Sequence, residues 1–93
     1  MTFFMFGKYS GEALEAISPK RTATARELVK KLGGKVKDIY ALLGQYDLVL
    51  IVELPTMTDA MKAAVALGRE TGISFCTAPA MTVADFDKLM VEA

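Results

Sequence analysis

The 93-residue sequence has no histidine, a single cysteine and a formal net charge of zero. Without histidine, the chain lacks the most common general base near pH 7, and it cannot build a Ser-His-Asp triad. The common zinc sites, which rely on histidine and several cysteines, are excluded as well. No glycine-rich phosphate-binding motif is present. We therefore expect no metal site and no cofactor.

The charge balance and the short hydrophobic runs exclude two classes of partner. Binding to nucleic-acid phosphates needs a basic surplus, whereas 11 basic residues here face 11 acidic ones. An apolar run such as residues 48–52 is far shorter than the roughly 20 residues of a membrane span. The first residues carry no cationic lead typical of a signal peptide. These features predict a cytoplasmic protein that binds neither nucleic acid nor membrane.

The lone cysteine, Cys76, cannot form an intrachain disulfide, which fits a reducing compartment. Without a histidine to activate it, Cys76 is a poor candidate nucleophile. We expect it to be a small buried residue.

Apolar and aromatic residues, in contrast, are abundant and make up 53% of the chain. Disordered chains are poor in such residues, so the chain is expected to fold. Its length allows one hydrophobic core, which predicts a single domain over residues 1–93.

Apolar periodicity and capping residues predict alternating strands and helices. We expect strands at residues 2–9, 36–43, 46–54 and 73–81, and a short helical turn after Ser10. Helices should follow the caps Ser18, Thr56 and Thr82 and end at Gly33-Gly34, near Arg69 and at Val91. This order is the ferredoxin-like βαββαβ arrangement, an α+β fold with a four-stranded antiparallel sheet and a short C-terminal helix.

Two local details of this prediction concern the hairpin and the second long helix. Gly44-Gln45 predicts a two-residue hairpin turn between the second and third strands. In the helix after Thr56, Met61, Ala64, Val65 and Gly68 form one stripe, and the small residues Ala60, Ala63, Ala64 and Ala66 are expected to let the helix approach the sheet closely.

The central strands are apolar on both faces, although the helices of this fold cover only one. In the first strand, Phe4 and Phe6 alternate with Phe3 and Met5, and the third strand shows the same pattern. A second copy of the chain is the simplest cover for the remaining face, giving a twofold-symmetric dimeric α/β barrel or a higher homo-oligomer. The alternative is that the terminal helix, which carries Phe86 and Leu89, folds across this face.

Five side chains are candidates for ligand binding: Tyr9, Arg21, Tyr40, Tyr46 and Asp47. Asp47 follows the hairpin turn and either bonds backbone amides or presents a carboxylate at a pocket mouth. The tyrosines either pack across strands or donate their hydroxyl groups to a ligand. Arg21 lies in the first turn of a helix, where the dipole disfavours a cation. This position favours a specific anionic partner, such as Glu53 or a ligand carboxylate.

The stretch Gly44-Gln45-Tyr46-Asp47 resembles the Gly-x-Tyr-Asp signature of the GYD domain family. Further matches extend over nearly the whole chain, at residues 6–10, 21–22, 32–36, 52–55, 72–77 and 82–86. The resemblance implies a branch of the dimeric α/β-barrel superfamily and transfers no catalytic residues. The hairpin is also similar to one in the effector-sensing domains of leucine-responsive regulators, which bind amino acids at oligomer interfaces. Their DNA-binding helix-turn-helix is not found in this sequence.

Three functions remain open at this point. The first is a homo-oligomeric small-molecule-binding or sensing module without a DNA-binding domain. The second is a cofactor-independent enzyme of the monooxygenase or isomerase type, with Asp47 as base and a tyrosine or Arg21 stabilising an oxyanion. The third is a structural subunit with no ligand.

Overall fold

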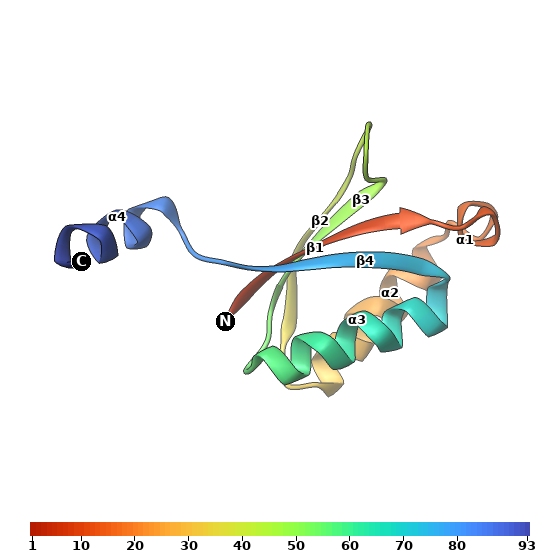
Figure 1. Ribbon diagram of the computed structural model, residues 1–93. Helices are drawn as coiled ribbons and strands as arrows, with labels where there is room; N and C mark the ends of the chain where they lie inside the picture. Colours follow the sequence, from red (N-terminus) through yellow and green to blue (C-terminus); the bar gives the residue numbers. More distant parts are fainter.

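The computed structural model describes all residues from Met1 to Ala93. The elements are β1 (Thr2–Tyr9), α1 (Gly11–Glu15), α2 (Pro19–Lys31), β2 (Lys35–Ala41), β3 (Leu48–Glu53), α3 (Met57–Thr71), β4 (Ile73–Ala80) and α4 (Val83–Glu92). The strands form one four-stranded antiparallel sheet in the order β2-β3-β1-β4 (Figure 1). The predicted ferredoxin-like α+β fold is confirmed.

The three longer helices begin at the predicted capping residues. The side chains of Ser18, Thr56 and Thr82 each accept a hydrogen bond from the backbone N–H three residues further on. Gly33 and Gly72 follow the ends of α2 and α3 with φ of +84° and +73°, a conformation that glycine adopts without strain. None of the helices is both long and apolar enough to cross a membrane.

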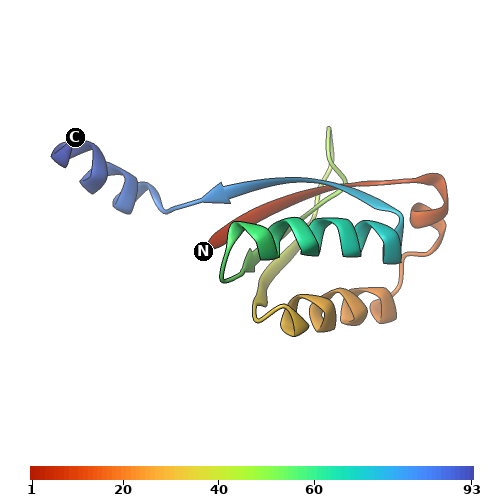
Figure 2. The same cartoon turned by 60° about the horizontal axis from the view of Figure 1, so that its bottom comes forward.

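The helices α2 and α3 lie on the same side of the sheet, which we call the inner face (Figure 2). Between them and the sheet lies a core of buried side chains from β1, β3 and both helices. Its largest members are Phe3, Met5, Leu54, Leu67, Val29 and Val52. The opposite side of the sheet, which we call the outer face, carries Phe4 and Phe6 from β1.

The expected close approach of α3 through its small residues is confirmed, but the stripe that contains Met61 and Val65 is not the buried side. Ala60, Ala63 and Leu67 are buried, whereas Met61 is 66% and Val65 is 54% exposed. One residue of an α-helix turns by about 100°, so two apolar stripes lie side by side on this helix. The alanine side carries less bulk, and it is this side that packs against the sheet.

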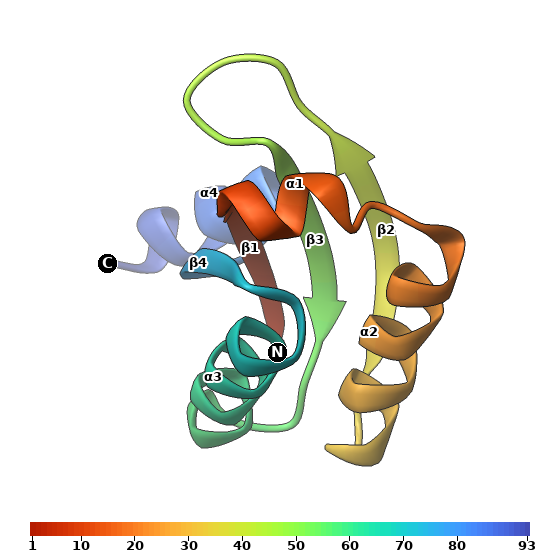
Figure 3. The same cartoon turned by 90° about the vertical axis from the view of Figure 1, so that its right-hand side faces the viewer.

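The β2–β3 connection is wider than the predicted two-residue turn. The Leu42 N–H donates to the Asp47 carbonyl at 2.8 Å, so residues 43–46 form the tip of the hairpin. Figure 3 shows this loop projecting beyond the sheet. The cause is that Asp47 pairs with β1, since its N–H donates to the Gly7 carbonyl at 2.8 Å.

No element of the chain covers the outer face of the sheet. The helix α4 leaves the end of β4 and extends away from the rest of the molecule (Figure 1). None of its residues is buried. The alternative in which this helix folds across its own sheet is therefore wrong in this structure.

Candidate functional site

The outer face of the sheet carries apolar side chains from all four strands. The strand register sets Tyr40 opposite Val49, Val49 opposite Phe6 and Phe6 opposite Cys76. The neighbouring row runs from Asp38 through Ile51 and Phe4 to Ala78. We define the outer patch as Phe4, Phe6, Tyr40, Ile51, Cys76 and Ala78. All six are at least partly exposed.

Tyr46 lies over one end of the outer patch. Its ring centroid is 5.3 Å from that of Phe6, in a tilted arrangement typical of aromatic pairs. Hydrogen bonding with the Cys76 thiol raises the pKa of Tyr46 above its ordinary value, and repulsion from the thiolate acts in the same direction. The Tyr46 hydroxyl therefore stays protonated and can donate a hydrogen bond.

The prediction that Cys76 is buried is wrong, because its side chain lies on the outer face and is exposed. Its neighbours Phe75 and Thr77 alternate to the inner face and are partly buried there. Cys76 is exposed because no helix covers the outer face, on which the alternation of β4 places its side chain.

Asp47 bonds the backbone at the far end of β1. Its carboxylate Oδ2 accepts a hydrogen bond from the Tyr9 N–H at 2.8 Å. Of the two alternatives for Asp47, the structure shows the bond to a backbone amide. A role of this carboxylate toward a ligand stays a prediction.

Tyr9 and Arg21 form a separate pair beside α1. The Arg21 guanidinium carbon lies 5.3 Å from the centre of the Tyr9 ring, a cation–π arrangement, and Nη1 donates to the Ala13 carbonyl. The suggested ion pair between Arg21 and Glu53 is absent, because Glu53 lies at the opposite end of the sheet. The five predicted ligand residues are thus divided: Tyr40 and Tyr46 share the outer face, whereas Tyr9 and Arg21 do not lie on it.

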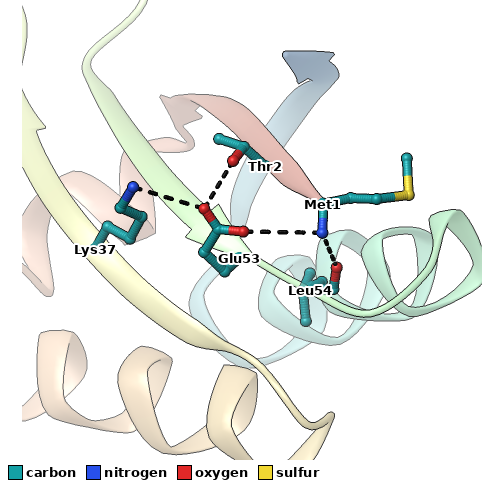
Figure 4. Close-up of polar contacts among 5 residues, drawn as sticks. All are labelled: Met1, Thr2, Lys37, Glu53 and Leu54. Atoms are coloured by element: carbon teal, nitrogen blue, oxygen red, sulfur yellow. Dashed lines mark hydrogen bonds and ion pairs between the residues drawn. The ribbon is translucent and has the colours of Figure 1, made fainter. Parts of the chain in front are cut away.

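A polar cluster that the sequence analysis missed lies at the β1 start of the sheet (Figure 4). Glu53 Oε1 accepts a hydrogen bond from the Thr2 hydroxyl at 2.7 Å and lies 3.6 Å from Lys37 Nζ. Its Oε2 lies 3.8 Å from the Met1 amino group, which donates to the Leu54 carbonyl at 2.9 Å. No local sequence pattern indicates this cluster, because it forms only when the start of β1 pairs with the end of β3.

The contacts of this cluster hold Glu53 in its ionised form. The hydrogen bond from Thr2 is the largest cause that lowers the pKa of Glu53, and the charges of Lys37 and the Met1 amino group add to it. Lys37 forms an ion pair with Glu53 at 3.6 Å, and because its ammonium group has three N–H donors it can also donate to another acceptor.

Next to this cluster, the outer face is hollowed. The hollow has a volume of about 290 Å³. Apolar side chains alternate in its lining with two charges and two hydroxyl groups; the lining residues are Thr2, Phe4, Lys37, Asp38, Ile51, Ala80, Met81 and Thr82. A larger hollow of about 340 Å³ beside Gly33 and Gly34 is more open and has fewer apolar lining residues.

Metal chemistry finds no support in the arrangement of these side chains. No three His, Cys, Asp or Glu residues gather where they could hold a metal ion. What the outer face offers instead is apolar contact, aromatic rings and a few charged groups at its two ends.

Comparison with known proteins places this fold and sequence. In the crystal structure of the Mycobacterium tuberculosis leucine response regulatory protein (LrpA), a region matches 87% of this chain with a TM-score of 0.58 and 10% sequence identity. The match covers 50% of the LrpA chain, so this protein spans about half of that regulator and shares its fold there. No curated protein sequence matches significantly. The family model of the GYD domain matches residues 3–90, and the chain therefore belongs to the GYD domain family.

Proposed function

We propose that this protein is a homo-oligomeric module that binds a small, largely apolar carboxylate in the hollow of its outer face. The observation that carries the proposal is an apolar, aromatic sheet face that no element of the chain covers. The regulator-type fold of the structural neighbour fits a sensing role for such a module.

The lining of the hollow supports this class of ligand. Phe4, Ile51 and Met81 provide apolar contact, which favours a hydrocarbon portion. Lys37 Nζ is the cation at the edge, and a carboxylate would accept a charge-assisted hydrogen bond from it. The volume of about 290 Å³ is at the lower end of ordinary ligand sites, so the molecule is small.

The open shape of the hollow connects binding to oligomerisation. Ligand sites usually bury about 70–90% of a ligand's surface, which a shallow hollow on one chain does not achieve. A second copy placed over the outer face would complete the enclosure. Tyr40 and Tyr46, which lie on the same face, would then stand at the interface.

The geometry favours binding over catalysis by Asp47. This carboxylate bonds the Tyr9 backbone at one end of the outer face. The hollow lies at the other end, near Thr2 and Ala80. A substrate held in the hollow would be out of reach of the candidate base.

Calorimetric titration with a panel of short-chain and branched carboxylates tests the proposal. In the Lys37→Met variant, the affinity should fall at least tenfold, because a hydrogen bond to a charged group contributes about 1.5–3 kcal/mol. The matched control is Lys30→Met on the exposed side of α2, which loses the same charge and should bind normally. Equal binding by both variants would contradict the site, and no binding by an oligomeric wild-type protein would indicate a structural subunit.

A further inference from the structure

We infer that α4 is an exchanged arm, whose apolar stripe packs on the outer patch of a second copy of this chain. The inference deepens the proposed function and rests on it in one respect, namely that the hollow is the ligand site. The stripe consists of Val83, Phe86, Leu89 and Met90.

The helix α4 is amphipathic but has no partner in its own chain. Phe86 and Leu89 are 48% and 49% exposed, and their spacing with Val83 and Met90 places them on one side of the helix. Lys88 lies on the opposite side, whereas Asp85 and Glu92 flank the stripe next to Leu89. Isolated helices shorter than about 12–15 residues are marginal in water, so a helix of 10 residues needs a packed face.

The outer patch is the matching surface on the same chain. It is apolar, it is formed by four paired strands, and apart from Tyr46 at one end nothing in its own chain covers it. Large contiguous apolar patches are rare on monomers and mark interaction sites.

The connection between β4 and α4 favours a second copy over the arm's own sheet. Only Met81 and Thr82 separate the two elements, and Thr82 is extended with φ −65° and ψ 151°. The arm therefore continues outward from β4, and both side views show it clear of the helices and the sheet (Figures 1 and 2). Because every copy carries both an arm and a patch, a twofold axis pairs them reciprocally and leaves neither uncovered.

Size and charge agree with this pairing. A standard interface involves roughly 20–30 residues on each side, which a patch of six residues does not reach alone. The arm adds 10 more residues, and the rim of the hollow adds the remainder. The arm carries three carboxylates and one lysine, whereas the adjoining strand β2 presents Lys35 and Lys37 beside a single Asp38.

Exchange of the arm would also enclose the ligand. Ala80, Met81 and Thr82, at the root of the arm, already line the hollow. A second copy seated on the outer face adds the missing wall. Ligand binding and arm exchange should therefore strengthen each other, as two linked equilibria must.

The native Cys76 provides a direct test, because it lies in the outer patch and is the only cysteine. Three single variants carry a cysteine on the stripe: Phe86→Cys, Leu89→Cys and Met90→Cys. For each variant, protein of light isotope composition is mixed with the same protein of heavy isotope composition, and the mixture is then oxidised. At least one should form a light–heavy disulfide to Cys76 more than fivefold faster than Lys88→Cys, the control on the polar side of the arm. A disulfide requires Cα atoms within about 7 Å, so the link reports direct packing.

Other cross-linking patterns would overturn the inference. Links within one copy would place α4 on its own sheet. Links between two Cys76 residues that persist unchanged in every variant would place the two outer faces directly together. Absence of any cross-link from a protein that is monomeric by light scattering at micromolar concentration would remove the second copy altogether.

A pair of substitutions keeps the test independent of cysteine chemistry. Leu89→Glu should weaken dimerisation at least tenfold, because it places a charge in the stripe. Val91→Glu makes the same kind of change off the stripe and should alter dimerisation less than twofold; equal effects would contradict the inference. Carboxylate binding to the Leu89→Glu monomer separates the two proposals. Weak binding together with failed arm exchange would support the hollow as the ligand site and contradict the exchanged arm. Arm exchange without carboxylate binding would support the exchanged arm and contradict the ligand site.

Discussion

The two faces of the sheet have similar composition but different surroundings. On the inner face, Phe3 and Met5 are 0% exposed beneath α2 and α3. On the outer face, their neighbours Phe4 and Phe6 are only partly buried, because no helix lies above them. The alternation within one strand thus separates a buried core from an uncovered apolar face.

This difference locates the apolar excess of the sequence. A sheet with one wet face would place polar residues where Phe4, Phe6 and Ile51 lie. The excess therefore lies on the uncovered face of the sheet more than in an enlarged core. Three pairs of substitutions test the contrast between the faces.

The largest expected effect comes from emptying the inner face. Phe3→Ala should lower the free energy of unfolding by about 3–5 kcal/mol, because it leaves a cavity in a closed core. Phe4→Ala removes the same atoms from the outer face and should cost clearly less in the monomer. Urea denaturation at low protein concentration measures both, and equal losses would contradict the division into a core and an uncovered face.

A smaller effect is expected from adding a methyl group to the inner side. A Cβ at Gly7 would lie 2.5 Å from Leu48 Cδ2 and 2.9 Å from Ile73 Cγ2, so Gly7→Ala should cost about 1–3 kcal/mol. Gly11→Ala in α1 meets no atom within 4 Å and should leave stability unchanged or slightly raised. Thermal unfolding measures the stability of both variants. An unchanged stability of Gly7→Ala would show that Leu48 and Ile73 move away from the added methyl group at little cost.

The smallest effect concerns the polar end of the outer face. The folded-state pKa of Glu53 lies below its ordinary value, so its stabilising contribution is present above the ordinary carboxyl pKa and is lost as pH falls through the depressed one. Thr2→Val removes the main hydrogen bond and should move the pKa of Glu53 back toward its ordinary value. A carbon-detected NMR titration follows this carboxyl, with Thr58→Val on α3 as the isosteric control. An unchanged titration would assign the shift to Lys37 and the Met1 amino group instead.

Local signals in the sequence predicted most of the fold. The hydroxyls of Ser18, Thr56 and Thr82 cap their own helices, and the alternation in residues 2–9 is that of β1. These features depend on hydrogen bonds and periodicities within a few residues. The width of the hairpin was missed because Asp47 is held by β1, which is distant in the sequence.

The candidate site was predicted only in pieces. Tyr40 and Tyr46 share the outer face, but Arg21 pairs with Tyr9 and the Ala13 carbonyl beside α1. Lys37 and Glu53 come together through the pairing of β2 with β3, including an irregularity between Val36 and Asp38. Such a register shift moves side chains from one face of the sheet to the other. No local sequence pattern predicts it.

The sequence by itself determined that the strands would be apolar on both faces and that four of them would alternate with helices. Those properties depend on residues that are close in the sequence, through side-chain alternation, helix periodicity and helix caps. Only the tertiary structure decided which face the helices cover, that Leu67 of α3 is buried while Met61 and Val65 stay exposed, and that α4 extends outward. Each of these depends on how closely distant segments can approach, and close approach is a property of the packed chain as a whole.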